Sequence, residues 1–175
     1  LVNIQGTKFK SGGPLLITHW GMSGPVILKL SALGARILSE LGYDFKVQVN
    51  WVNETNNDVV ADLLKSIVHS HSKKILSNMR PYLLPERLWL YLLEKSDLSA
   101  EKMWGELGKK SLNKLVRVLT NDVYQVKGKT TFKEEFVTCG GVSLKSLDLN
   151  TMQSKVCKGL YSAGDILDID AITGG

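Results

Sequence analysis

The spacing of hydrophobic residues changes twice along this chain, and these changes constrain its fold more than any other feature. Residues 44–52 alternate apolar and polar side chains, and a period of two predicts a half-buried strand. From Thr55 to residue 120, large apolar residues recur every three or four positions, which predicts amphipathic helices. Alternation returns after Asn121. We therefore expect an α+β fold in which strands flank a helical insertion.

The first helix is expected directly after a glycine-rich turn. A short apolar strand over 15–18 precedes it, and Ser23 is placed to cap its amino terminus. Pro25 suits the first turn, where a missing N–H costs little, and Gly42 ends the helix. The expected buried face comprises Val26, Ile27, Leu30, Leu33, Ile37, Leu38 and Leu41.

Four helices are expected in the insertion. Residues 55–58 match a capping box for the first, and Pro85 opens the second. Ser99 is placed to cap a short third helix, and apolar spacing over 112–119 predicts the fourth. Beyond the insertion we expect a hairpin turn over 127–129, extended chain over 132–138 and a buried strand over 159–164. The β-rich unit is thus expected over 1–54 and 121–158, and the helical subdomain over 55–120.

Composition and charge narrow the classes of protein that fit. Of the 175 residues, 43% are hydrophobic and 22% charged, which is typical of a globular domain. No apolar stretch reaches the ~20 residues of a membrane span. The chain has a net charge of +5, and its positive charge is spread thinly over residues 1–158, which disfavours nucleic acid as a partner. Its densest run, Lys109, Lys110, Lys114 and Arg117, reads as the solvated face of a helix. Two cysteines without a disulfide framework predict reduced thiols and a cytoplasmic protein.

Most motifs with apparent chemistry have a structural explanation. Ser23 lacks a nucleophile elbow, because Pro25 stands where the second glycine of G-x-S-x-G belongs. His69 and His71 have no metal-ligand spacing, so no metal site is expected. No G-x-G-x-x-G fingerprint occurs, so the chain carries no complete dinucleotide site of its own.

The carboxyl-terminal segment differs. Gly164 and Asp165 follow an apolar run, and a carboxylate there could accept hydrogen bonds from sugar hydroxyls. Thr173, Gly174 and Gly175 offer backbone N–H groups to an anion. These five residues are the candidate cofactor-binding residues.

Three blocks of sequence together resemble one family. Residues 13–25, Gly-Pro-Leu-Leu-Ile-Thr-His-Trp-Gly-Met-Ser-Gly-Pro, resemble the signature G-x-L-L-F-T-H-x-G-L-S-G-P of the BaiN/aminoacetone-oxidase-like flavoproteins. Residues 138–142 are similar to their T-x-G-G-V, and residues 159–175 to their G-L-Y-F-A-G-E-V-L-D-x-D-G-x-T-G-G. Asp165 replaces the family glutamate and keeps the carboxylate, whereas Ala171 replaces a glycine and departs from the family pattern.

The resemblance implies a bacterial FAD-dependent, NAD(P)-linked oxidoreductase. In that family this region is an insert in the FAD domain, built as a small β-barrel that a helical subdomain interrupts. Residues 159–175 then begin a truncated FAD-domain segment, and Asp165 is expected beside the ribityl chain. The partners would be the FAD-binding domain of the same polypeptide and a small-molecule substrate, with no membrane. The chain begins without Met, so we expect a fragment that binds no FAD when isolated.

Two other functions stay open at this stage. A stand-alone basic module could bind nucleic acid through the helical subdomain, and salt-sensitive binding would reveal it. A serine hydrolase centred on Ser23 is the third hypothesis. The sequence assigns no residue a general acid or base role, because flavin chemistry resides mainly in the cofactor.

Overall fold

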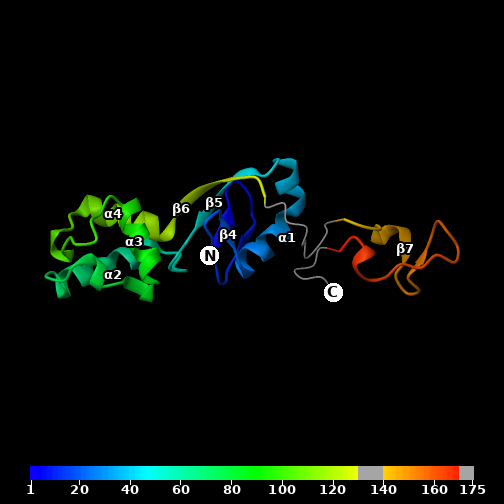
Figure 1. The fold of residues 1–175 in the computed structure, drawn as a ribbon. Helices are drawn as coiled ribbons and strands as arrows, with labels where there is room; N and C mark the ends of the chain where they lie inside the picture. The colour runs from blue at the N-terminus through cyan, green and yellow to red at the C-terminus, as the bar shows by residue number, and fades with distance from the viewer. Residues whose placement is uncertain (130–139, 170–175) are drawn as a thin grey trace. The chain divides into compact units, whose positions relative to one another are not determined.

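The computed structural model describes residues 1–129 and 140–169 (Figure 1). Contacts divide the chain into two compact units, one of Leu1 with residues 48–124, the other of residues 2–47 with 125–175. In Figure 1 the helices α2, α3 and α4 lie together, and α1 lies with the blue strands of the amino-terminal part. The α+β fold class expected from the sequence is confirmed. No helix in the described ranges is long and apolar enough to cross a membrane.

Four strands form the main sheet, in the order β2-β1-β5-β6. Their bounds are Val2–Ile4 (β1), Lys10–Ser11 (β2), Asp44–Val49 (β5) and Asp122–Lys127 (β6). The Gln5 N–H donates to the Lys46 carbonyl and the Asn50 N–H to that of Leu1, so β1 and β5 run antiparallel. The sheet stays open among the described strands, and the extended chain expected over 132–138 lies outside them. A closed barrel is therefore not part of the described fold.

Helix α1 (Pro25–Glu40) packs against this sheet through a stripe at four-residue spacing. Its buried residues are Val26, Leu30, Gly34 and Leu38. A Cβ on Gly34 would lie 3.2 Å from Ile4 Cδ1, so the small residue lets the helix approach strand β1 closely. Leu33 and Leu41, expected inside, are exposed. The prediction was wrong there because the single stripe that meets the small sheet is narrower than the apolar pattern.

The expected caps and the short third helix need correction. Ser23 lies in strand β4 (Met22–Ser23), and Gly24 takes the cap position of α1 without a side-chain bond. In the insertion, Asn56 rather than Thr55 caps α2, its side chain accepting from the Asp58 N–H at 2.9 Å. Ser99 opens only turns, followed by the 3₁₀ turn η3 (Trp104–Glu106). The side-chain oxygen of asparagine caps a helix as well as a threonine hydroxyl does, so the sequence alone did not decide between Thr55 and Asn56.

The helical unit contains α2 (Asn57–Ser70), α3 (Glu86–Lys95) and α4 (Lys109–Thr120). The 3₁₀ turns η1 (Leu76–Asn78), η2 (Pro81–Leu83) and η3 connect them. At its core, the Trp89 and Trp104 rings stack with centroids 6.1 Å apart. The Trp89 indole also donates to the Leu76 carbonyl at 2.7 Å, so its polar group is satisfied although the ring is fully buried. The leucine-rich segments of this unit therefore enclose a hydrophobic core, as their spacing predicts.

A buried carboxylate ties together the two chain segments that enter and leave this helical unit. Asp122 is 2% exposed and accepts from the Trp51 indole at 3.0 Å and from the Tyr124 hydroxyl. It also pairs with Lys95, whose ammonium lies 3.8 Å from the centroid of the Tyr124 ring. Burial, and next the hydrogen bond to Asp122, raise the pKa of Tyr124 well above its ordinary value. We call Trp51, Lys95, Asp122 and Tyr124 the Asp122 cluster.

In residues 140–169 the chain forms a small hairpin of β7 (Leu147–Asp148) and β8 (Gln153–Ser154). The 3₁₀ turns η4 (Leu144–Ser146) and η5 (Gly164–Ile166) flank it. The buried strand expected over 159–164 is wrong: Tyr161 forms one isolated bridge with Gln153, and its side chain is exposed. A segment with a single bridge partner has no ladder on its other edge and no sheet face to bury its apolar side chains.

Candidate functional site

The first motif of the sequence forms an exposed hairpin. Strand β3 (Leu16–Ile17) pairs with β4, and the turn between them closes through Thr18, whose N–H and hydroxyl donate to the Gly21 carbonyl. The turn carries Trp20, which is 64% exposed. The side chains of Leu16 and Ile17 are also exposed. This hairpin therefore presents an apolar surface.

Gly24 is the residue that joins the hairpin to α1. Its φ is +93°, and a Cβ there would lie 3.0 Å from the Leu16 nitrogen and 3.2 Å from the Pro14 carbonyl oxygen. Only glycine fits this conformation and this close approach. Ser23, just before it, forms no described hydrogen bond with a histidine or a carboxylate. The hydrolase hypothesis thus gains no support from the described residues.

The second and third motifs meet in the carboxyl-terminal part. Val142 and Leu167 form a parallel bridge, in which the Val142 N–H donates to Ile166 O at 2.8 Å and the Asp168 N–H to Val142 O at 3.0 Å. Gly141 makes this approach possible, because a Cβ there would lie 2.4 Å from Ile166 O. Two glycine-containing motifs about 25 residues apart in the chain are therefore neighbours in the fold.

Among the candidate cofactor residues, Gly164 and Asp165 lie in the turn η5, beside this bridge. Gly164 has φ +72° with no atom within 4 Å of an ideal Cβ, and Asp165 is exposed. Asp165 occupies the middle of this 3₁₀ turn, which has no side-chain cap. Thr173, Gly174 and Gly175 lie outside the described residues.

Asp168, one of the carboxylates that follow Gly164, forms an ion pair within the chain. It accepts from the Arg36 guanidinium at 2.5 Å. An opposite charge at this distance offsets the repulsion between Asp168 and the carboxylate of Asp165, three residues before it. The clustering of these carboxylates therefore gives no independent argument for a cofactor, and the case for Asp165 depends on its position.

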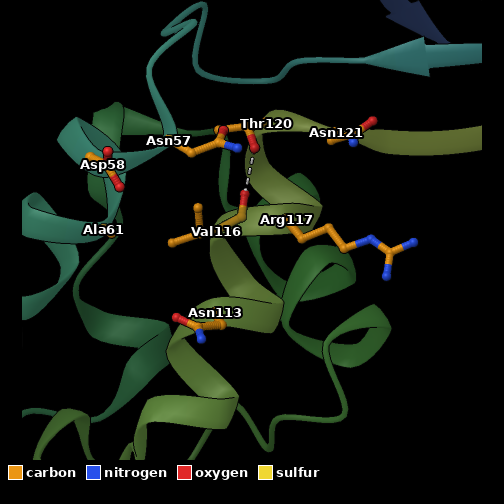
Figure 2. Close-up of a pocket in the computed structure, with 8 residues that line it drawn as sticks. All are labelled: Asn57, Asp58, Ala61, Asn113, Val116, Arg117, Thr120 and Asn121. Carbon is orange, nitrogen blue, oxygen red and sulfur yellow. Dashed lines mark hydrogen bonds between the residues drawn. The ribbon is translucent and has the colours of Figure 1, made fainter.

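A separate polar groove lies in the helical unit, between the start of α2 and the end of α4 (Figure 2). Its volume is about 220 Å³, and it is lined by Asn57, Asp58, Ala61, Asn113, Val116, Arg117, Thr120 and Asn121. In Figure 2, Asn57 and Thr120 lie at one end and Asn113 at the other. Sequence reasoning predicted no groove here, because residues from two helices far apart in the chain make it.

The described ranges contain no group of three or more histidine, cysteine, aspartate or glutamate side chains that could hold a metal ion. Cys157 is exposed and unpaired with another cysteine. Cys139 lies outside the described residues.

Comparison with known proteins gives one family and several relatives. The model of the HI0933-like protein barrel and H2TH domain matches residues 2–137. The ribosomal RNA dihydrouridine synthase of Escherichia coli (strain K12) is 28% identical over 174 residues, which cover 98% of this chain and 40% of that protein. The protein of the same name from Haemophilus influenzae is 27% identical over 92% of the chain and 37% of its own length.

A third relative has a different name. The 3-dehydro-bile acid delta(4,6)-reductase of Clostridium scindens is 26% identical over 93% of this chain and 40% of its own length. The chain thus spans about two-fifths of each of these relatives. Since the family model covers most of the sequence, the chain belongs to the HI0933-like family, in the part that comprises the barrel and H2TH domain.

Proposed function

We infer that this chain is the insert domain of an FAD-dependent, NAD(P)-linked oxidoreductase, followed by a short cofactor-contacting segment. The family match over residues 2–137 carries the proposal. The meeting of the two glycine motifs at Gly141 and Leu167 supports it. The exposed hairpin with Leu16, Ile17 and Trp20 would contribute an apolar wall to the substrate cavity.

The residues around η5 fit a flavin. Gly140 and Gly164 have φ values of +101° and +72°, and nothing lies within 4 Å of an ideal Cβ at either position. Their backbone is therefore open to a ligand that needs close approach. The Asp165 carboxylate would accept from a ribityl hydroxyl, and Thr173, Gly174 and Gly175 would add N–H donors. When bound, FAD would supply the hydride for the reduction, and the chain's role is to bind and orient it.

The names of the relatives agree on one class of reaction. Dihydrouridine is uridine with its ring carbon–carbon double bond saturated, and that bond lies beside a carbonyl. A 3-dehydro-delta(4,6) bile acid also carries carbon–carbon double bonds conjugated to a ketone. We therefore propose the reduction of a carbon–carbon double bond conjugated to a carbonyl. A hydride goes to the carbon remote from the carbonyl, a proton goes to the adjacent carbon, and NAD(P)H is oxidised overall.

Replacing Asp165 with Ala is expected to weaken FAD binding about ten- to hundred-fold in the full-length gene product that contains these residues. A charge-assisted hydrogen bond typically contributes ~1.5–3 kcal/mol, and ~1.4 kcal/mol corresponds to tenfold in affinity. Asp165→Asn keeps an acceptor oxygen and should be milder. The measurement is flavin affinity by fluorescence quenching.

Asp62→Ala serves as the control for this experiment, because Asp62 is an exposed carboxylate on α2 whose described ion pair is with Lys65. It should leave flavin affinity unchanged. Unchanged affinity in Asp165→Ala together with a lower melting temperature would assign Asp165 a structural role instead.

A further inference from the structure

We propose that the α2–α4 groove and the exposed face of α4 bind a single-stranded segment of RNA, with one unstacked nucleotide in the groove. This inference rests on the proposed reduction and assigns its substrate to the nucleic-acid class. Its evidence lies wholly within the helical unit. It concerns residues that the family resemblance did not assign.

The charged residues of helix α4 are all of one sign. The helix carries four basic residues and no acidic one. Lys114 pairs with Asp97, but among the described ion pairs none involves Lys109, Lys110 or Arg117. Lys110 and Arg117 are exposed and seven residues apart, which places them on one side of the helix, about 10 Å from each other. Two cations on one face with no described ion pair suit two phosphates of one strand.

The groove at the end of this face holds uncommitted amide groups. Asn57, Asn113 and Asn121 line it, and none of their side chains takes part in a described hydrogen bond. An amide offers two donors and one acceptor oxygen, the pattern that reads the edge of a nucleobase. Ala61 and Val116 supply an apolar part of the lining. Unpaired bases of RNA are recognised through such edges, because they are free to leave the stack.

The size of the groove selects among ligands. A volume of about 220 Å³ equals roughly seven water molecules at ~30 Å³ each. Pockets that enclose drug-sized ligands have ~300–1,000 Å³, so this groove would not enclose a flavin or a steroid. One pyrimidine ring is of a suitable size. The groove therefore favours a nucleotide over the other ligands that the relatives suggest.

The one acidic residue of the lining orients the nucleotide. Figure 2 shows Asp58 on the α2 side, whereas Arg117 extends away from it on the other side of Val116. A phosphate near Asp58 would be repelled, so the backbone should follow Arg117 and Lys110. The base edge then faces Asn57 and Asp58, where the carboxylate can accept from a ring or amino N–H.

Fluorescence anisotropy with a labelled uridine-containing 12-nucleotide RNA tests the proposal on the 175-residue chain. We expect salt-sensitive binding, and the double variant Lys110→Ala/Arg117→Ala should bind at least ~10-fold more weakly at 0.1 M salt. Arg117→Ala alone should reduce the slope of log affinity against log salt by ~0.7, the value for one phosphate contact on a single strand. Arg117→Lys keeps the charge and should keep the slope. Asn113→Ala should lower affinity without changing the slope, because an amide contact releases no counterion.

The matched control is Arg87→Ala, which removes the same charge from an exposed position on α3. It should change neither affinity nor slope beyond error. Equal effects of Arg87→Ala and Arg117→Ala, or no RNA binding by the wild type, would overturn the proposal. Equal affinity for an acidic peptide would identify a protein partner and overturn it as well. A full-length protein that holds flavin but binds no RNA would retain the proposed oxidoreductase function and lose only this inference.

Discussion

Replacing Asp122 with Ala is expected to lower the free energy of unfolding by about 3 kcal/mol, because this buried carboxylate accepts two hydrogen bonds and pairs with Lys95, whose side chain is 30% exposed. The substitution leaves the Lys95 ammonium without its carboxylate and the Trp51 indole N–H and Tyr124 hydroxyl without their acceptor. Each unsatisfied buried donor adds to the cost. Urea unfolding followed by tryptophan fluorescence measures the change.

Asp62→Ala is also the matched control for Asp122→Ala. The Asp62 carboxylate pairs with a lysine as well, Lys65, but it is 73% exposed and lies in a regular helix. An exposed pair contributes no more than ~1 kcal/mol, so this variant should be nearly as stable as the wild type. Similar losses in both variants would show that the Asp122 cluster does not hold the two ends of the helical unit.

The same cluster predicts the response to alkaline pH. Because burial and the bond to Asp122 raise the pKa of Tyr124, the folded protein keeps this proton at a pH where the unfolded chain has lost it. Its contribution to stability is complete below the ordinary tyrosine pKa of ~10 and is lost as the pH rises above it. In Asp122→Ala the hydrogen-bond contribution to the pKa is gone, so the alkaline decline should be shallower.

Replacing Gly141 with Ala is expected to open the contact between the two glycine motifs. The new Cβ would lie 2.4 Å from Ile166 O, 2.7 Å from Leu167 C and 2.8 Å from Leu167 O. These are backbone atoms, so the new methyl group cannot be accommodated by moving the end of a side chain. One of the two chain segments must shift. The amide N–H groups of Val142 and Asp168 should exchange at least ~100-fold faster with solvent, equivalent to about 2.7 kcal/mol. Hydrogen exchange read by NMR measures both.

Gly21→Ala is the control for this variant, because nothing lies within 4 Å of an ideal Cβ at Gly21 and its φ is not in the left-handed region. The protection of Val142 and Asp168 should then stay unchanged. In the full-length protein, only Gly141→Ala should also weaken flavin binding. Retained protection in Gly141→Ala would mean that the two motifs do not meet as described.

The long helices were the part of the fold that sequence could predict. α1, α2, α3 and α4 each carry two or more turns of apolar spacing, enough for the period to be read. Strands β1 and β2 have three and two residues, too few for a period, and they were missed. The apolar run over 159–164 looked like a buried strand because sequence does not show whether a neighbouring strand is present to cover it.

Among the candidate sites too, residues within a local motif could be predicted, whereas residues that the fold brings together could not. Gly164 and Asp165 could be named because they follow a local motif, and the glycine pair around Gly141 belonged to another. The groove could not be predicted, since it depends on Asn57 and Asn121 approaching from opposite ends of a segment of more than sixty residues. Asp122 was also missed, because its donors come from three separate parts of the chain.

The most direct test of the central claim uses the full-length gene product that contains this chain. After purification, its visible absorbance should show bound flavin, and NAD(P)H should bleach that absorbance in the absence of oxygen. Adding a uridine-containing RNA or a conjugated steroid ketone should then restore it, with a product that has gained two hydrogen atoms. A purified protein that holds no flavin and takes up none on addition of FAD would contradict the account.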